Sequence, residues 1–177
     1  MKKYEFTGET KEIRLLFRTA TLHRIRATVA FGIVEVGDLG GWIEKEENLS
    51  HEGKAWVWGN AEVWGDAKVC GDAKVWGNAK VWGNAEVCGD AEVFSASHVL
   101  VIGAIGSRND FTTFYRDKDN EITVKCGCFL GKIDRFLEKV TQTHGDSKYA
   151  LVYRAAVEVA KLQIDLSGEA PKDADEE

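Results

Sequence analysis

The stretch AWVWGNAEVWGDAKVCGDAKVWGNAKVWGNAEVCGDAEVFSA, residues 55–96, decides the fold, because it repeats one six-residue pattern seven times. Each repeat reads Ala-x-Val-(Trp/Cys)-Gly-(Asn/Asp) until the last one, where Ser95 replaces the glycine. A period this strict is typical of a solenoid. Val favours a strand, and Gly followed by Asn or Asp favours a turn. Since side chains alternate along a strand, we expect Val and the next Ala to point inward and the neighbours of Val to point outward.

The repeat resembles the hexapeptide-repeat, left-handed parallel β-helix, in which three hexamers make one coil. That resemblance implies that residues eighteen apart in the chain stack on each other. The charges before each Val support this spacing, because like charges at sheet distance would repel and here every stacked pair is opposite in sign. These pairs are Glu62 with Lys80, Lys68 with Glu86, and Lys74 with Glu92.

The resemblance predicts a short left-handed parallel β-helix. The patterns of the flanking segments add an N-terminal β cap and a C-terminal α+β domain, so the predicted fold is mainly β. The predicted divisions are residues 1–54 for the cap, 55–96 for the β-helix, 97–166 for the α+β domain and 167–177 for a disordered acidic tail. Within the cap, the first half of residues 22–31 alternates apolar and polar as a half-buried strand does. Within the C-terminal domain we expect strands at 111–115 and 122–129, and helices at 132–143 and from Asp146 or Ser147 to about Ile164.

Aromatic residues follow most of the valines, and we expect them to form ladders on the outside of the repeat. They either cover the backbone or make a contact with a partner or a flat ligand. Seven hexamers give a thin core, so we favour a homo-oligomer, with a trimer as the best guess. The predicted interface residues are Trp58, Trp64, Trp76, Trp82 and Phe94.

The lead-in to the repeat is similar to that of phage and prophage hexapeptide-repeat proteins. The residues that carry this resemblance are Arg24–Ala27, Gly37–Glu44, Asn48–Ser50 and Ala55–Val57, and the match covers about residues 20–95. It implies a phage protein that works in the cytoplasm of an infected bacterium. Family labels of this kind follow the repeat and carry no demonstrated chemistry.

Composition narrows the classes of function. A net charge of −6 argues against binding to polymeric nucleic acid. The sequence has no apolar run of the length that a membrane span needs and no signal-peptide core. Four cysteines without a CxxC motif predict reduced thiols in a cytosol, with Cys70 and Cys88 as stacked side chains in preference to a disulfide or a metal pair. We expect no cofactor and no metal.

Two polar loops in the C-terminal segment are candidate ligand sites. One offers a guanidinium, hydroxyls and backbone amides that suit an anion or phosphate, although Arg108 and Asp110 could simply pair with each other. The other precedes the second helix and could bind an anion or act as a plain cap. The candidate residues are Ser107, Arg108, Asn109, Asp110, Thr112, Thr113, Lys125, His144, Lys148 and Tyr149.

These observations predict a non-catalytic, oligomeric binding protein. With phage context from the resemblance, the favoured ligand is a small anionic nucleotide of host anti-phage immunity, cyclic or derived from ADP-ribose, which the protein sequesters. The first alternative is a structural or protein-interaction scaffold. A hexapeptide-repeat acyltransferase is less favoured, because residues 55–96 contain no histidine. Cys126 with His144 is a conceivable catalytic pair.

Overall fold

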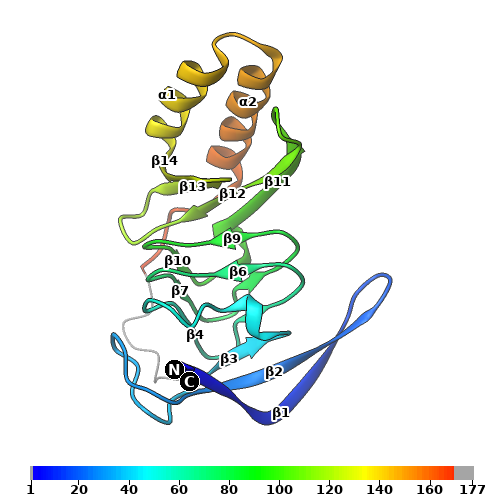
Figure 1. Cartoon of the computed structure of the whole chain (residues 1–177), viewed down its shortest axis with the longest axis vertical. Helices are drawn as coiled ribbons and strands as arrows, with labels where there is room; N and C mark the ends of the chain where they lie inside the picture. Colours follow the sequence, from blue (N-terminus) through cyan, green and yellow to red (C-terminus); the bar gives the residue numbers. More distant parts are fainter. Residues whose placement is uncertain (1, 170–177) are drawn as a thin grey trace.

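The computed structural model describes residues 2–169 as a mainly β chain with four separate sheets and two helices (Figure 1). The N-terminal segment contains β1 (Tyr4–Arg14), β2 (Thr19–Ala27) and β3 (Leu39–Ile43). The repeat contributes the two-residue strands β4 (Trp56–Val57), β5 (Glu62–Val63), β6 (Lys68–Val69), β7 (Lys74–Val75), β8 (Lys80–Val81), β9 (Glu86–Val87) and β10 (Glu92–Val93). The C-terminal segment contains β11 (Val99–Ile105), β12 (Asp110–Arg116), β13 (Ile122–Cys126), β14 (Phe129–Lys132), α1 (Ile133–His144) and α2 (Lys148–Gln163).

Strands of the repeat pair in parallel with strands eighteen residues away. The register pairs Glu62 with Lys80, Lys68 with Glu86 and Lys74 with Glu92, which confirms the predicted opposite-charge stacking. In two of the pairs the side chains also meet: Lys74 Nζ lies 3.3 Å from a carboxylate oxygen of Glu92, and Lys80 Nζ lies 3.8 Å from one of Glu62. The pairing at this spacing was therefore predictable from the charges.

Glycine at the corners lets neighbouring turns approach closely. Gly71 has a φ of +69°, and a Cβ atom there would lie 2.8 Å from the backbone nitrogen of Gly89. Any other residue would be strained and would push the two turns apart. Inside the turns, every alanine and valine of the repeat from Ala55 to Val93 is at most 1% exposed, so the predicted inward positions are confirmed.

The predicted fold class, however, is wrong. The strands of the repeat are two residues long and belong to three separate sheets, with orders β1-β2-β3-β5-β8, β10-β7-β4 and β6-β9. The first of these mixes N-terminal strands with strands of the repeat, because β3 pairs in parallel with β5. A β-helix with an N-terminal β cap and a C-terminal α+β domain does not describe this arrangement. A mainly β chain of several short sheets with two helices does.

The hairpin of β1 and β2 projects sideways from the body of the molecule (Figure 1). Side chains of β2 contact the body, since Ala20, near the turn, and Leu22 are both buried. An ion pair of 2.7 Å between Lys11 and Glu62 also ties it to β5. In the turn of the hairpin, Arg18 pairs with Glu44, whereas Leu16 and Phe17 are exposed.

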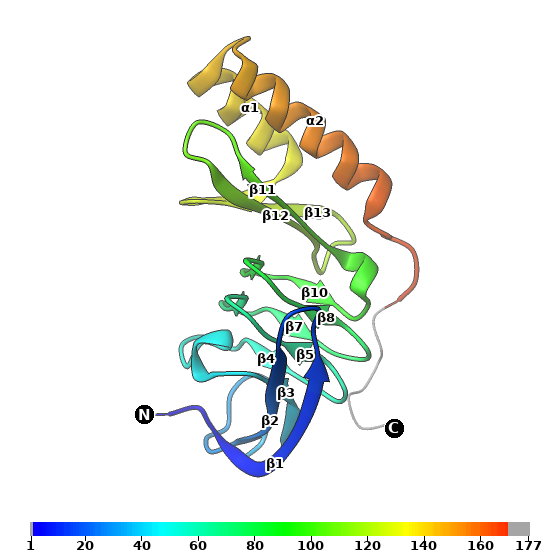
Figure 2. The same cartoon turned by 90° about the vertical axis from the view of Figure 1, so that its right-hand side faces the viewer.

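The fourth sheet, β11-β12-β13-β14, is antiparallel and separates the helices from the repeat (Figure 2). Neighbouring residues of β12 point to opposite faces of the sheet: Phe114 packs with Phe136 of α1, while Tyr115 belongs to the core of the repeat.

The predicted helices at 132–143 and 146–164 are confirmed within two residues. The predicted strand at 122–129 is two strands, because Gly127 turns the chain with a φ of +54°. The predicted disordered tail falls mostly on residues 170–177, which lie outside the described part of the chain.

Candidate functional site

A polar cleft of about 450 Å³ opens between the corner turns of the repeat and the edge of the C-terminal sheet. We use the name polar cleft for the space lined by Lys45, Glu47, Asp66, Ala67, Lys68, Asn84, Glu86, Asp110, Phe111, Thr113, Lys125 and Gly127. Three candidates from the sequence, Asp110, Thr113 and Lys125, therefore lie together in it. Four carboxylates and three ammonium groups make its charge mixed.

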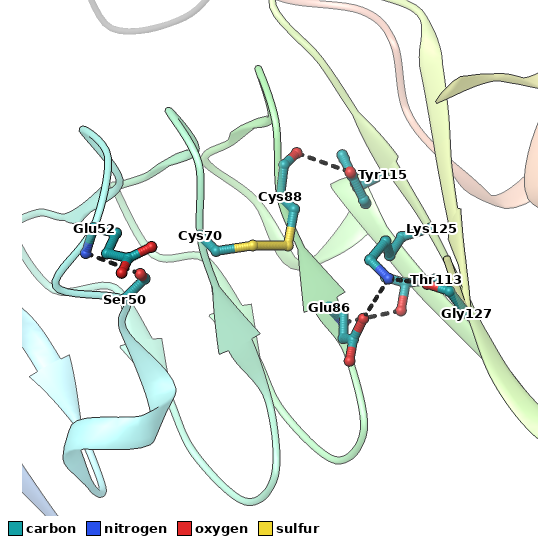
Figure 3. Close-up of a disulfide and its surroundings, with 9 residues drawn as sticks. All are labelled: Ser50, Glu52, Cys70, Glu86, Cys88, Thr113, Tyr115, Lys125 and Gly127. Carbon is teal, nitrogen blue, oxygen red and sulfur yellow. Dashed lines mark hydrogen bonds and ion pairs between the residues drawn. A yellow bond between two sulfur atoms is a disulfide. The ribbon is translucent and has the colours of Figure 1, made fainter. Parts of the chain in front are cut away.

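The upper wall of the polar cleft is fixed by contacts between β9 and the C-terminal sheet (Figure 3). Thr113 Oγ1 accepts a hydrogen bond of 3.0 Å from the backbone N–H of Glu86. Lys125 Nζ lies 2.9 Å from the Glu86 carboxylate and also donates to the carbonyl oxygen of Gly127. Thr113 and Lys125 face each other across β12 and β13, so both point to the repeat. Lys125 is thus held in place, with most of its donor capacity in use.

The lower wall contains a second ion pair. Lys45 Nζ lies 2.9 Å from Asp66 Oδ1, and this hydrogen bond raises the pKa of Lys45 and lowers that of Asp66. Lys68, by contrast, is exposed and makes no ion pair with any described residue. Lys68 is therefore the ammonium group of the cleft that is available to a ligand.

Arg108 borders the polar cleft from the turn between β11 and β12. A Cβ atom at Gly127 would lie 3.7 Å from an Arg108 guanidinium nitrogen, so the guanidinium group lies close to the cleft lining. The alternative in which Arg108 pairs with Asp110 is not what the structure has: Asp110 Oδ1 instead accepts a hydrogen bond of 2.7 Å from the N–H of Phe111. Within the described residues Arg108 has no anionic partner.

The other residues of this turn have structural contacts. Asn109 has a φ of +50°, a turn conformation that asparagine tolerates better than most residues. Thr112 is buried, and its hydroxyl donates to Cys126 Sγ at 3.3 Å. Ser107 lies exposed in the same turn and does not line the cleft. Of the predicted loop, Asp110 therefore lines the cleft, whereas Asn109 and Thr112 stabilise the turn and the sheet.

An apolar pocket of about 300 Å³ adjoins the polar cleft. We use this name for the space lined by Lys80, Trp82, Gly83, Asn84, Ala85, Val99, Leu100, Val101 and Phe111. Asn84 and Phe111 line both spaces, so the two are neighbours. Trp82 stacks on Trp64 with ring centroids 5.4 Å apart, and its indole is half exposed. The pocket therefore presents aromatic surface beside charged groups.

The predicted exposed ladders are wrong for three of the tryptophans. Trp58, Trp64 and Trp76 are each 8% exposed, and Phe94 is partly buried against the core of the repeat. Trp58 packs edge to face on Trp76, which in turn stacks on Phe94. Trp82 is the tryptophan of the ladders that stays accessible, because it has one aromatic partner, Trp64, whereas Trp76 lies between Trp58 and Phe94.

The second candidate loop does not reach the polar cleft. His144, Lys148 and Tyr149 contact one another between α1 and α2: the rings of His144 and Tyr149 are 6.0 Å apart, and Lys148 Nζ lies over the Tyr149 ring. Cys126 and His144 do not form a pair either. Tyr153 stands between them, with its hydroxyl 3.9 Å from Cys126 Sγ and its ring stacked on His144. Burial raises the pKa of Tyr153 to about 12.

The prediction that Cys70 and Cys88 are reduced thiols is wrong for this structure. They form a disulfide between the residues that directly follow β6 and β9, with Cα atoms 4.6 Å apart (Figure 3). Residues at neighbouring positions of paired strands come within the distance that a disulfide needs. Cys126 and Cys128 are free.

Sequence reasoning missed the lower half of the polar cleft. Lys45, Lys68 and Asn84 lie in the repeat or its lead-in, where each looks like an ordinary solvated side chain. Asn84 follows the corner glycine Gly83, and the chain there turns toward β12. Only the position of the C-terminal sheet over these corners makes them a site.

The described residues contain no group of three or more His, Cys, Asp or Glu side chains placed to hold a metal ion. No helix in residues 2–169 is long and apolar enough to cross a lipid bilayer. No family model matches the chain, and no curated protein is detectably similar to it in sequence.

Proposed function

We propose that this protein is a non-catalytic binding protein that holds a small anionic ligand, a nucleotide, in the polar cleft. One observation carries the proposal: Lys68 lines a cleft that also contains the aromatic ring of Phe111, and the Arg108 guanidinium lies beside Gly127 in the wall of that cleft. Neither cation has an ion-pair partner among the described residues. Phosphate oxygens are natural acceptors for both cations. An aromatic side chain beside them suits the flat base of a nucleotide.

The charge balance of the polar cleft restricts the ligand. Lys125 and Lys45 are already paired with Glu86 and Asp66, so they neutralise the walls and add little attraction for an anion. Two free cations suit a ligand with one or two phosphates. A densely charged polyanion would be repelled by Glu47 and Asp110.

The side chains that line the polar cleft suit binding of a ligand without a chemical reaction. The cleft lining contains no cysteine, histidine or serine, and its one hydroxyl, on Thr113, accepts from the N–H of Glu86 and donates to no carboxylate of the described residues. An activated nucleophile needs a base within hydrogen-bond reach. A sequestering protein needs affinity alone, so a ligand signalling host immunity in the bacterial cytoplasm, as the phage resemblance suggests, is the favoured candidate.

The test is a binding assay on the full chain with cyclic dinucleotides, cyclic ADP-ribose isomers and ADP-ribose. We expect one of them to bind, and to be recovered chemically intact after heat denaturation. Lys68→Ala and Arg108→Ala should each weaken binding about tenfold or more, because a charged hydrogen bond is lost. Lys139→Ala is the matched control, since Lys139 is exposed on α1 and should change nothing.

The results separate this proposal from its alternatives. Recovery of a cleaved nucleotide would show an enzyme, and binding of coenzyme A instead would favour the acyltransferase. Absence of binding to all of these nucleotides, with folded protein, would overturn the proposal.

A further inference from the structure

The most exposed large apolar side chains of the described chain include two neighbours at one end of the hairpin. Leu16 is 87% exposed and Phe17 is 93% exposed in the turn between β1 and β2. We call these two residues the hairpin tip. Water contact with two large apolar side chains is unfavourable, and Figure 1 shows that this turn lies away from the rest of the molecule.

The hairpin tip is held in a fixed direction. Arg18, the next residue, makes two hydrogen bonds from its guanidinium group to the carboxylate of Glu44, and one of them measures 3.0 Å. This pairing lowers the pKa of Glu44. Lys11 pairs with Glu62 and lies over the ring of Trp42. A preorganised apolar projection loses less entropy on binding than a flexible one.

The apolar pocket of the same chain has a lining that suits such an apolar projection. The apolar pocket is walled by the half-exposed ring of Trp82, by the 99–101 segment of β11 and by Phe111. Its volume of about 300 Å³ lies at the small end of ligand-sized pockets, which suits one or two apolar side chains. β8, in its wall, is the last strand of its sheet. The backbone N–H groups of Lys80 and Trp82 have no backbone partner among residues 2–169 and can donate to an incoming chain.

Charges near the two surfaces are complementary. Arg14 lies two residues before the hairpin tip, and Asp110 lies next to Phe111 at the pocket rim. Both are exposed, and within the described residues neither makes an ion pair. The hairpin and the pocket belong to opposite edges of the five-stranded sheet, β1 and β2 on one side and β8 on the other. Ion pairs with Glu44 and Glu62 hold the hairpin of each molecule, and its tip stays exposed instead of entering that molecule's own pocket.

We propose that the hairpin tip of one copy of this chain inserts into the apolar pocket of a second copy. The contact joins two different surfaces, so it closes as a reciprocal pair or as a small ring. In either case the partner subunit's Phe17 lies beside Asn84 and Phe111, and it forms a side wall of the polar cleft. This inference does not depend on the identity of the ligand.

The first experiment is sedimentation of the full chain over a range of concentrations. The wild type should associate, and the double variant Leu16→Ser with Phe17→Ser should associate at least about a hundredfold more weakly, because two buried side chains are lost. Leu162→Ser is the matched control: Leu162 is 90% exposed on α2 and should leave association unchanged. A monomeric wild type, an unaffected double variant or a dissociated control would each overturn the proposal.

The second experiment separates lost contact from lost folding. Trp82→Ser damages the pocket and keeps the hairpin tip, whereas the double variant does the reverse. Each variant alone should be monomeric, and their mixture should form a hetero-oligomer through the one intact pair of surfaces. No association in the mixture, with both variants folded by circular dichroism, would contradict the insertion. Nucleotide binding can be measured on the same variants, so failure of this inference is distinguishable from failure of the ligand proposal.

Discussion

The hydroxyl of Tyr115 donates a hydrogen bond of 2.8 Å to the carbonyl oxygen of Cys88 and so joins the C-terminal sheet to the last turn of the repeat. Both groups are buried, and burial raises the pKa of the Tyr115 phenol well above its usual range. We expect Tyr115→Phe to lower the free energy of unfolding by about 1–3 kcal/mol, because it leaves the carbonyl unsatisfied. Urea unfolding measures this. Tyr149→Phe is the control, since the Tyr149 hydroxyl makes no hydrogen bond to a described residue, and an equal effect there would contradict the argument.

The two tryptophans Trp76 and Trp82 should differ in their contribution to stability. Trp76 is buried between Trp58 and Phe94, so Trp76→Ala leaves a cavity and should cost about 3–5 kcal/mol. Trp82 is half exposed and has one stacked partner, so Trp82→Ala should cost less than half as much. Unfolding curves in urea compare the two. Equal losses would mean that Trp82 is covered in solution to the same degree as Trp76.

Asp117 should make the protein sensitive to acid. Burial by itself would raise the pKa of Asp117, but hydrogen bonds from Lys132, from Thr123 and from backbone N–H groups outweigh it and lower the pKa. A lowered pKa in the folded state stabilises the fold above the unfolded pKa, near 4, and this stabilisation is lost as the pH falls through the folded value. We expect stability to fall below about pH 4.

Asp117→Asn tests this dependence. It should reduce stability at pH 7, because Lys132 loses a buried partner, and it should flatten the acid limb of the stability profile. Asp134→Asn, at an exposed position, should leave the profile as it is. An unchanged acid limb in the Asp117 variant would assign the acid sensitivity to other carboxylates.

The disulfide between Cys70 and Cys88 should add stability without affecting the ligand. It closes a loop of eighteen residues, so reduction or the double change to serine should cost about 3 kcal/mol. Thermal unfolding with and without dithiothreitol measures the difference. Affinity for the ligand should stay the same, because neither cysteine lines the polar cleft. Changing Cys126 and Cys128 to serine is the control for thiol chemistry.

The periodicity of residues 55–96 made the pairing within the repeat predictable. It did not predict which other strands pair with the repeat. The alternating charges at Glu62 and Lys80 fix the pairing of strands eighteen residues apart, and the invariant Val and Ala positions fix the interior. The membership of β3 in the same sheet as β5 depends on a contact between Trp42 and Glu62 in register, for which the sequence carries no periodic signal. That contact is the reason why the predicted fold class failed.

The candidate site was predictable in part for a similar reason. Lys125 and Thr113 could be recognised as polar residues on one face of neighbouring strands. Lys68 could not, because its role depends on where a separate sheet lies over the repeat. The burial of Trp64 was hidden too, since it depends on long-range packing that a six-residue pattern does not encode.

The contacts of Thr113 and Tyr115 with the last turn of the repeat have a consequence for assembly. Short parallel strands stacked at a constant spacing can template another chain at their open end, in the manner of a growing fibril. Thr113 occupies an N–H of β9, Tyr115 occupies the carbonyl that follows it, and His98 Nδ1 accepts from the N–H of Phe94 after β10. These three side chains block further pairing at β9 and β10, so β8 is left as the face of the last turn at which another chain can still add.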